Sequence, residues 1–167
     1  MTAELGNDRP RSQEARLRPM TAADLVQVLA LEHELFPDDP WSAQMFAEEV
    51  AQPPESRLYL VAETGAADVM AGYAGMMFVR AGVQADVLTI AVRPEHWGGG
   101  IGSALLAAMF QAARDHGCTE VFLEVRADNL RAHGLYLRRG FEEIGVRRGY
   151  YQPSGTDAIV MRKDLLC

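Results

Sequence analysis

The sequence contains little cysteine, a single lysine and no long apolar run. Its two cysteines, Cys118 and Cys167, share no metal-ligand spacing, which argues against a disulfide framework and against a cysteine metal site. No apolar run approaches the ~20 residues of a membrane-spanning helix, and the first residues contain no apolar signal core. The four histidines are scattered, so we predict no bound metal. Together these absences predict a cytoplasmic protein that does not enter a membrane.

Positive charge is missing from one long segment. Between Thr21 and Ser56 the chain has eight carboxylates and neither Lys nor Arg, whereas Arg126 to Arg148 holds six arginines and three acids. The net charge of −7 argues against a general nucleic-acid binder. The uneven distribution has two interpretations. It indicates either two solvated helix faces, or an acidic entrance for a cationic substrate beside a basic flank for an anionic cofactor.

Apolar spacing and turn residues predict one α/β domain over residues 15–167, preceded by a disordered tail at residues 1–14. The predicted order is β-α-α-β-β-β-α-β-α-β-β. Helices are expected after Thr21, after Ser42, after a glycine loop and after Asn129. Met45, Phe46 and Val50 are expected on one face of the second helix. Strands are expected at residues 16–20, 58–62, 69–79, 85–92, 120–125, 141–147 and 158–161, and the second to fourth of them form an antiparallel meander.

The most informative segment is Val87 to Ser103, where an apolar strand and a short loop lead into four glycines and a helix. A helix start offers unpaired N–H groups and partial positive charge, so this arrangement is typical of a phosphate site. A nucleotide P-loop is excluded because no lysine follows the glycines; the single lysine is Lys163. A dinucleotide loop fits poorly, because Ser103 replaces its third glycine and too little chain follows.

The loop Trp97-Gly98-Gly99-Gly100-Ile101-Gly102 resembles the acetyl-coenzyme A loop of the GNAT acetyltransferases, [RQ]-x-x-G-x-[GA]. The predicted element order is also similar to that of the GNAT fold, which implies a mixed central sheet of about seven strands. Three further segments resemble the RimI branch of the family, whose members acetylate the N-terminal amine of a small-subunit ribosomal protein. These segments are Leu123 to Asn129 (LEVRADN), Gly134 to Phe141 (GLYLRRGF) and Arg147 to Pro153 (RRGYYQP).

The chain departs from the family pattern in two places. Trp97 stands where the family usually has Gln or Arg, which removes one side-chain contact to the cofactor but leaves the backbone cradle. The segment Leu35 to Phe46 is similar to the F-P-W-S substrate segment of the branch, with three extra residues: Asp38, Asp39 and Pro40. These extra residues alter the expected shape of the substrate entrance.

The resemblance implies roles for individual residues. Glu124 is the expected general base and Tyr136 the expected acid that protonates the departing thiolate. The expected cofactor residues are Ile90, Ala91, Val92, Gly98, Gly99, Gly100, Ile101, Gly102, Ser103 and Asn129. The expected substrate residues are Trp41, Tyr150 and Tyr151. The parallel strands that carry Val92 and Glu124 must splay to admit the pantetheine arm.

Each role has a structural alternative. An ion pair with Arg126 or Arg131 would explain Glu124, and a helix cap would explain Asn129. Core packing would explain Tyr136, and surface packing would explain the two neighbouring tyrosines.

The leading hypothesis is an acetyl-CoA-dependent enzyme that acetylates the α-amine of a protein, with a cationic N-terminal peptide as its partner. We expect no direct nucleic-acid contact and a monomer or weak dimer. One rival is a GNAT enzyme that acts on lysine side chains or a small amine. A rival from another class is a non-catalytic acyl-CoA-binding module, against which the presence of both Glu124 and Tyr136 argues.

Overall fold

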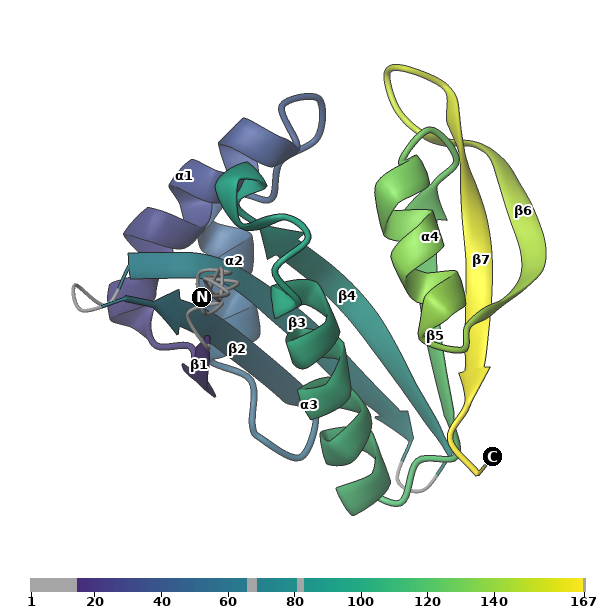
Figure 1. Ribbon diagram of the computed structural model, residues 1–167, viewed down its shortest axis with the longest axis horizontal. Helices are drawn as coiled ribbons and strands as arrows, with labels where there is room; N and C mark the ends of the chain where they lie inside the picture. Colours follow the sequence, from purple (N-terminus) through teal and green to yellow (C-terminus); the bar gives the residue numbers. More distant parts are fainter. Residues whose placement is uncertain (1–14, 66–68, 81–82, 167) are drawn as a thin grey trace, which may run out of the picture.

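The computed structural model describes residues 15–65, 69–80 and 83–166, so the predicted tail at residues 1–14 lies outside the described residues. The strands form one seven-stranded sheet in the order β1-β2-β3-β4-β5-β7-β6 (Figure 1). The strands are β1 (Arg16–Pro19), β2 (Arg57–Thr64), β3 (Val69–Arg80), β4 (Gln84–Val92), β5 (Glu120–Arg126), β6 (Glu142–Tyr151) and β7 (Thr156–Asp164). The helices are α1 (Leu25–Leu35), α2 (Ala43–Val50), α3 (Ile101–Asp115) and α4 (Leu130–Arg138). Short 3-10 turns at Ala22–Asp24 and Pro94–His96 precede α1 and the glycine loop.

The element order is the one that the sequence predicts. Strands β2, β3 and β4 pair antiparallel in succession, which confirms the meander. Strands β4 and β5 pair parallel, and α3 makes the crossover between them. The sheet is therefore mixed, as the resemblance to the GNAT fold implies.

Two apolar clusters lie on opposite faces of the sheet. Helix α3 packs its buried side on one face, together with Tyr136 of α4 and Phe141. Helices α1 and α2 pack Val28, Leu31 and Phe46 on the other face of β2 to β4. In Figure 1, α3 crosses in front of β2 to β4, whereas α4 lies beside β5 and β7.

Local sequence explains where the helices begin and end. The six residues predicted for the buried side of α3 are all buried: Ile101, Leu105, Leu106, Met109, Phe110 and Ala113. Ser42 caps α2 by accepting a hydrogen bond from the Met45 N–H at 3.1 Å. The prediction for Met45 itself is wrong, because it is 45% exposed. The next residue, Phe46, points into the core instead.

The strands β4 and β5 separate along their length, as the sequence analysis predicts. Their pairing covers only Gln84 to Asp86 against Glu120 to Phe122. A register shift in the β3–β4 pairing leaves Leu88 without a partner residue, two residues after the last β4–β5 pair at Asp86. Such a bulge bends a strand and increases its twist. The bulge accounts for the way β4 turns away from β5, which is visible in Figure 1.

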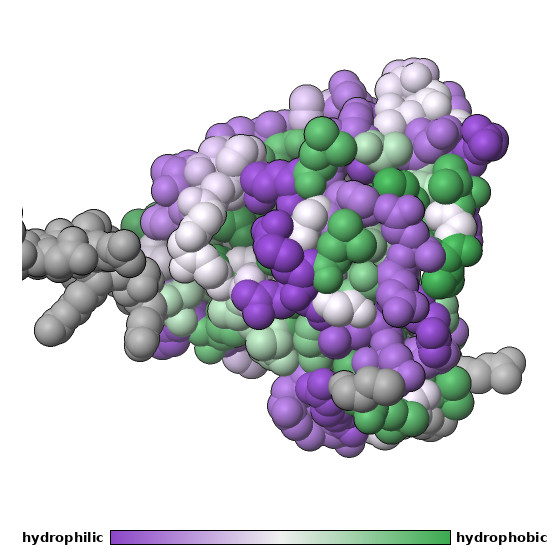
Figure 2. Space-filling model, turned by 45° about the vertical axis from the view of Figure 1, so that its right-hand side comes forward, coloured by the Kyte–Doolittle hydropathy of each residue, from purple (hydrophilic) through white to green (hydrophobic). Residues whose placement is uncertain are grey.

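The face shown in Figure 2 carries hydrophobic side chains as small separate patches among hydrophilic ones. Strand β6 contributes exposed apolar residues such as Ile144 and Val146, at 51% and 54% exposure. Within the described ranges, none of the helices is long and apolar enough to span a bilayer.

Candidate active site

A cavity of about 1080 Å³ lies where β4 and β5 separate. Its walls come from the end of α1 and the loop after it, from β4, from the glycine loop and α3, and from β5 and α4. Along Val87 to Val92, β4 keeps its pairing with β3, while its pairing with β5 has ended. The cavity therefore has an unpaired strand edge along one wall, where an extended ligand can add as a strand does.

The structure brings most of the predicted site residues to this one cavity. The predicted residues that line it are Trp41, Ile90, Ala91, Val92, Gly98, Gly100, Ile101, Gly102, Ser103, Glu124, Asn129, Tyr136 and Tyr151. Gly99 and Tyr150 are not among the residues that line it. No group of three His, Cys, Asp or Glu side chains within the described part of the chain is placed to hold a metal.

The glycines of the loop serve different purposes. Gly98 and Gly100 have φ values of 79° and 86°, a left-handed conformation that other residues rarely adopt. Gly100 is the N-cap of α3 and provides no side-chain cap, so the first N–H groups of the helix are left for a ligand. Gly102 serves packing, because a Cβ there would lie 3.1 Å from the Leu135 side chain of α4.

Asn129 lies at the start of α4 and Ser103 in the first turn of α3, and both line the cavity. The Asn129 side-chain oxygen accepts from the Ala132 N–H at 3.2 Å, so the residue caps α4. This confirms the capping interpretation and leaves its amide nitrogen for a ligand. The Ser103 hydroxyl accepts from both Nε and Nη2 of Arg139, at 3.0 and 2.7 Å.

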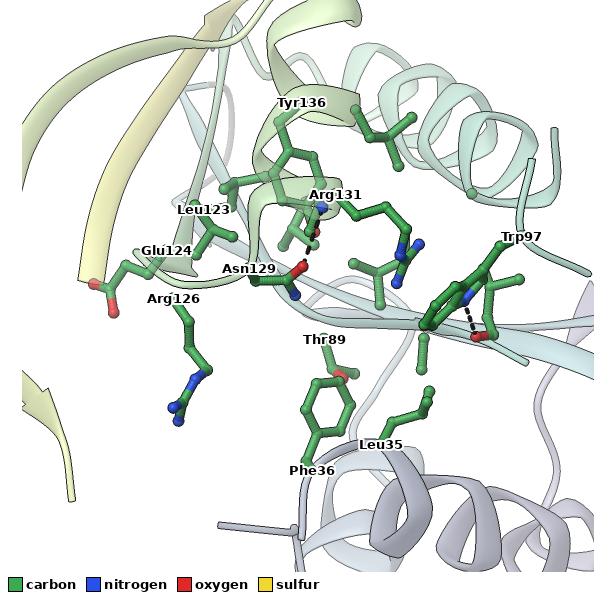
Figure 3. Close-up of a pocket in the computed structure, with 18 of the residues that line it drawn as sticks. Leu35, Phe36, Thr89, Trp97, Leu123, Glu124, Arg126, Asn129, Arg131 and Tyr136 are labelled. Atoms are coloured by element: carbon green, nitrogen blue, oxygen red, sulfur yellow. Dashed lines mark hydrogen bonds between the residues drawn. The ribbon is translucent and has the colours of Figure 1, made fainter. Parts of the chain in front are cut away.

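Glu124 lies on the face of β5 opposite to Leu123 and Val125, which belong to the cluster under α3. Its carboxylate points away from Tyr136 in Figure 3. It pairs with Arg147 of β6, with 3.2 Å between Oε1 and Nε, and its side chain is 26% exposed. Glu124 therefore forms an ion pair, as its structural alternative predicts, but with Arg147 and not with Arg126 or Arg131. The expected partners Arg126 and Arg131 engage other groups.

Tyr136 lies on the other side of β5, in the cluster under α3, and is 5% exposed. Its ring packs against Phe141, with 5.7 Å between the centroids. Burial raises the pKa of its phenol well above the ordinary value. The phenol is therefore in its protonated form near neutral pH.

The two tyrosines at the end of β6 differ in role. Tyr151 lines the cavity beneath the Arg126 guanidinium, which lies 5.1 Å from the ring centroid. Burial, with a contribution from the Glu124 carboxylate, raises the pKa of Tyr151 to about 12. Tyr150 instead hydrogen-bonds the Glu124 side chain, whose charge raises the Tyr150 pKa. Tyr150 therefore contacts the expected base rather than the cavity.

A buried polar group on the α1 side was missed in the sequence analysis. Glu32 is 2% exposed, lines the cavity and accepts hydrogen bonds from the Tyr73 hydroxyl and from the Trp41 N–H, the latter at 3.0 Å. Burial raises the pKa of Glu32, while these two hydrogen bonds oppose the shift. The available signal was its spacing, because Glu32 follows Val28 and Leu31 on the buried face of α1.

Trp97 and Arg131 meet across the cavity. The Trp97 indole N–H donates to the Val92 carbonyl at 2.8 Å. The Arg131 guanidinium lies 3.6 Å from the centroid of the Trp97 ring, and Figure 3 shows the side chain running from α4 toward that ring. Both residues line the cavity on the side of the glycine loop.

The comparisons with known proteins agree with this geometry. The model of the acetyltransferase (GNAT) family matches residues 24–141. The chain belongs to this family. It is 41% identical over 150 residues to the N-alpha-acetyltransferase RimI of Mycobacterium tuberculosis, a match that covers 87% of this chain and 89% of that protein.

Relatives from Escherichia coli point to the same branch. Over 124 residues the chain is 34% identical to the ribosomal protein bS18-alanine N-acetyltransferase of strain K12, covering 73% of this chain and 79% of the relative. The crystal structure of the ribosomal-protein-S18-alanine N-acetyltransferase from Escherichia coli superposes with a TM-score of 0.78, at 31% identity and over 91% and 94% of the two chains. The chain is thus a RimI-like N-acetyltransferase, which confirms the family, the fold and the enzyme class predicted from the sequence.

Proposed function

We propose that this enzyme transfers the acetyl group of acetyl-CoA to the α-amine of a protein N-terminus, with the N-terminal alanine of ribosomal protein bS18 as its substrate. The names of its relatives support the substrate. The observation that carries the proposal is the cavity between the separated ends of β4 and β5. There, a glycine-rich helix start and a half-buried carboxylate open into one space.

The donor half of the cavity fits a phosphate-bearing thioester. The uncapped start of α3 offers N–H groups and partial positive charge to a pyrophosphate. The unpaired edge along Ile90, Ala91 and Val92 offers backbone groups to the amides of the pantetheine arm. A backbone N–H at this edge would also hydrogen-bond the thioester oxygen, where negative charge develops during the reaction. Acetyl-CoA, when bound, supplies the activated acetyl group.

In the acceptor half, Glu124 acts as the general base. The α-amine has an ordinary pKa near ~8 and arrives largely as ammonium. Glu124 accepts a proton from it, directly or through one water, and the freed nitrogen lone pair forms the C–N bond. Its ion pair with Arg147 and its hydrogen bond with Tyr150 fix the carboxylate on the acceptor side of β5.

Tyr136 acts as the general acid on the opposite side of β5. As the C–S bond breaks, its phenol donates a proton to the leaving sulfur, whose thiol form has an ordinary pKa near ~8.5. Burial keeps the phenol protonated until that step, but it also makes the phenol a weaker acid, so the transfer is coupled to the departure of the sulfur. Placing the acid and the base on opposite faces of one strand keeps them from exchanging a proton with each other.

The test is a thiol-release assay with acetyl-CoA and three acceptors of equal concentration. These are an Ala-initiated ribosomal peptide, the same peptide blocked at its N-terminus and carrying an internal lysine, and a polyamine. We expect turnover on the free peptide and an acetyl mass increment on its first residue. Turnover on only the blocked peptide or the polyamine would contradict the proposed acceptor. Binding of coenzyme A without thiol release on any acceptor would favour the non-catalytic module.

A further inference from the structure

The Trp97–Arg131 pair joins the glycine loop to α4 through a stacked guanidinium. The guanidinium carbon of Arg131 lies 3.6 Å from the centroid of the Trp97 ring. The indole ring is itself fixed, because its N–H donates to the Val92 carbonyl at 2.8 Å. The stack therefore holds the guanidinium at one place beside the strand edge and the helix start.

The position of Arg131 is not explained by an ion pair. Within residues 15–65, 69–80 and 83–166, no carboxylate forms a salt bridge with it, whereas Arg126 and Arg147 each have one. Burial is the main influence on its guanidinium and lowers its pKa. A partly buried cation without an anion, lining a cavity, indicates that the anion is a ligand.

The surroundings of the pair indicate which part of a ligand would meet it. Gly98, Gly100 and Gly102 line the cavity on the same side, where the first N–H groups of α3 have no side-chain cap. Arg139 lies nearby through its two hydrogen bonds to Ser103. Arg131, Arg139 and the free N–H groups thus lie on the side of the glycine loop, whereas Glu124 and Arg126 lie away from it in Figure 3.

We propose that Arg131, positioned by the Trp97 ring, supplies the guanidinium that binds the pyrophosphate of acetyl-CoA. Trp97 occupies the loop position where the family usually has Gln or Arg. In this chain the cation is Arg131, which comes from α4. Trp97 is a positioning residue and Arg131 the residue that touches the phosphates. A guanidinium can make two parallel hydrogen bonds to a phosphate while its face remains on the ring. The inference rests on the proposed donor, acetyl-CoA.

The experiment measures binding of coenzyme A by calorimetry and steady-state kinetics with acetyl-CoA for the wild type and five variants. Loss of a charge-assisted contact in R131A should weaken coenzyme A binding roughly 10- to 100-fold. The KM for acetyl-CoA should rise in parallel, with kcat and the peptide KM near the wild type. R131K should recover little of the loss, because an ammonium neither stacks in the same way nor bridges two oxygens. R148A, which removes an exposed arginine of β6, is the matched control and should bind as the wild type.

Two further comparisons separate positioning from general damage. W97A should weaken binding less than R131A, and W97A/R131A should be no weaker than R131A alone, because the ring acts through the guanidinium. S-acetyl-pantetheine, which lacks the nucleotide and the pyrophosphate, should react equally well with the wild type and R131A. 3′-Dephospho-coenzyme A should show the full R131A effect if the pyrophosphate is the contact, and none if the 3′-phosphate is.

Several results would overturn the inference. Wild-type affinity of R131A for coenzyme A would show that the guanidinium does not meet the phosphates. Tighter binding by R131A would show that the Trp97–Arg131 pair obstructs the cavity. Additive losses in the double variant would remove the positioning role of Trp97. Failure of the wild type itself to bind coenzyme A would instead contradict the proposed function, so the two failures are distinguishable.

Discussion

The donor side and the acceptor side of the cavity differ in charge and in construction. The donor side has Arg131 and Arg139 beside an uncapped helix start. The proposed acceptor side has Asp38, Asp39 and Glu124, together with Arg126, which forms an ion pair with Asp128. If the proposed function is right, an anionic donor meets the cations of the first side and a cationic acceptor meets the carboxylates of the second. The arginines of residues 126–148 lie on both sides, because Arg131 and Arg139 are near the glycine loop whereas Arg126 and Arg147 are near Glu124.

Among variants that test the difference between the two sides, E124Q is expected to have the largest effect on kcat. The amide retains the shape of the side chain but does not accept a proton from the substrate, so kcat should fall roughly 100- to 1000-fold. The KM for acetyl-CoA should stay near the wild type, because Glu124 lies on the acceptor side. Initial rates at saturating acetyl-CoA measure both quantities.

The matched control for E124Q is E120Q. Glu120 lies on the same face of β5 but pairs with Arg162, outside the cavity. E120Q should keep wild-type kcat. An E124Q variant with wild-type kcat from pH 6 to 9 would contradict the assignment of Glu124 as the general base. No general base would then be assigned on the acceptor side.

Y136F is expected to lower kcat by roughly 10- to 100-fold, because the leaving thiolate must then take its proton from water. The raised pKa of Tyr136 also predicts that no loss of its proton limits the rate at alkaline pH up to about 10. A pH–rate profile of the wild type tests this second point. Y59F serves as control, since Tyr59 is a buried tyrosine hydrogen-bonded to Glu49. Equal rates for Y136F and Y59F would remove Tyr136 from the mechanism.

D24N tests how the start of α1 is held, because the other end of this helix lines the cavity. Asp24 is buried and accepts from Arg18 at 2.7 and 2.8 Å, and this ion pair lowers its pKa from 3.8 to about 2. A depressed carboxyl pKa stabilises the fold above the unfolded-state value, and this stabilisation is lost as the pH falls through the folded-state value. D24N should therefore lower the free energy of unfolding at pH 7 by about 2 kcal/mol.

Urea unfolding followed by circular dichroism measures the effect of D24N. The difference from the wild type should narrow between pH 4 and pH 2, where the wild-type Asp24 also becomes neutral. E55Q, at an exposed carboxylate, should leave the stability unchanged. A pH-independent difference for D24N would mean that packing, and not the Arg18–Asp24 ion pair, anchors this end of α1.

The smallest effect is expected for D38N/D39N, in the loop after α1. Both residues are exposed, and their charges act on Arg126 and Tyr150 across the cavity. The KM for a cationic peptide should rise roughly three- to five-fold at low salt and less at high salt, because exposed charges are screened. The KM for acetyl-CoA should not change. R131A should show the opposite pattern, with a raised KM for acetyl-CoA and an unchanged KM for the peptide. The control variant E34Q/E55Q removes two exposed charges elsewhere and should change neither the peptide KM nor the acetyl-CoA KM. An equal rise of the peptide KM in this control would show that the effect comes from net charge.

The two sides also differ in how far the sequence predicts them. Two parts of the donor side are local features of the sequence: the left-handed Gly100 at the start of α3, and Asn129, which caps α4. Local rules for caps and turns identify such features directly. The fold was predictable for the same reason, since apolar spacing identified every strand and helix in order.

The acceptor side depends on contacts between residues far apart in the chain. Glu32 meets Tyr73, 41 positions away, and Glu124 meets Arg147 from a different strand. The donor side has one such contact as well, the pairing of Trp97 with Arg131. No local pattern specifies such partners, because they follow from the order of strands in the sheet and from the separation of β4 and β5.

The most direct test is a crystal structure with a bisubstrate analogue, in which coenzyme A is joined through an acetyl bridge to the α-nitrogen of an Ala-initiated peptide. The account predicts the pyrophosphate at the start of α3 in contact with Arg131. It predicts the α-nitrogen on the Glu124 side of β5, within hydrogen-bonding reach of the carboxylate directly or through one water, and the sulfur beside Tyr136. An analogue bound with its peptide on the α3 face, or with its nitrogen remote from Glu124, would contradict it.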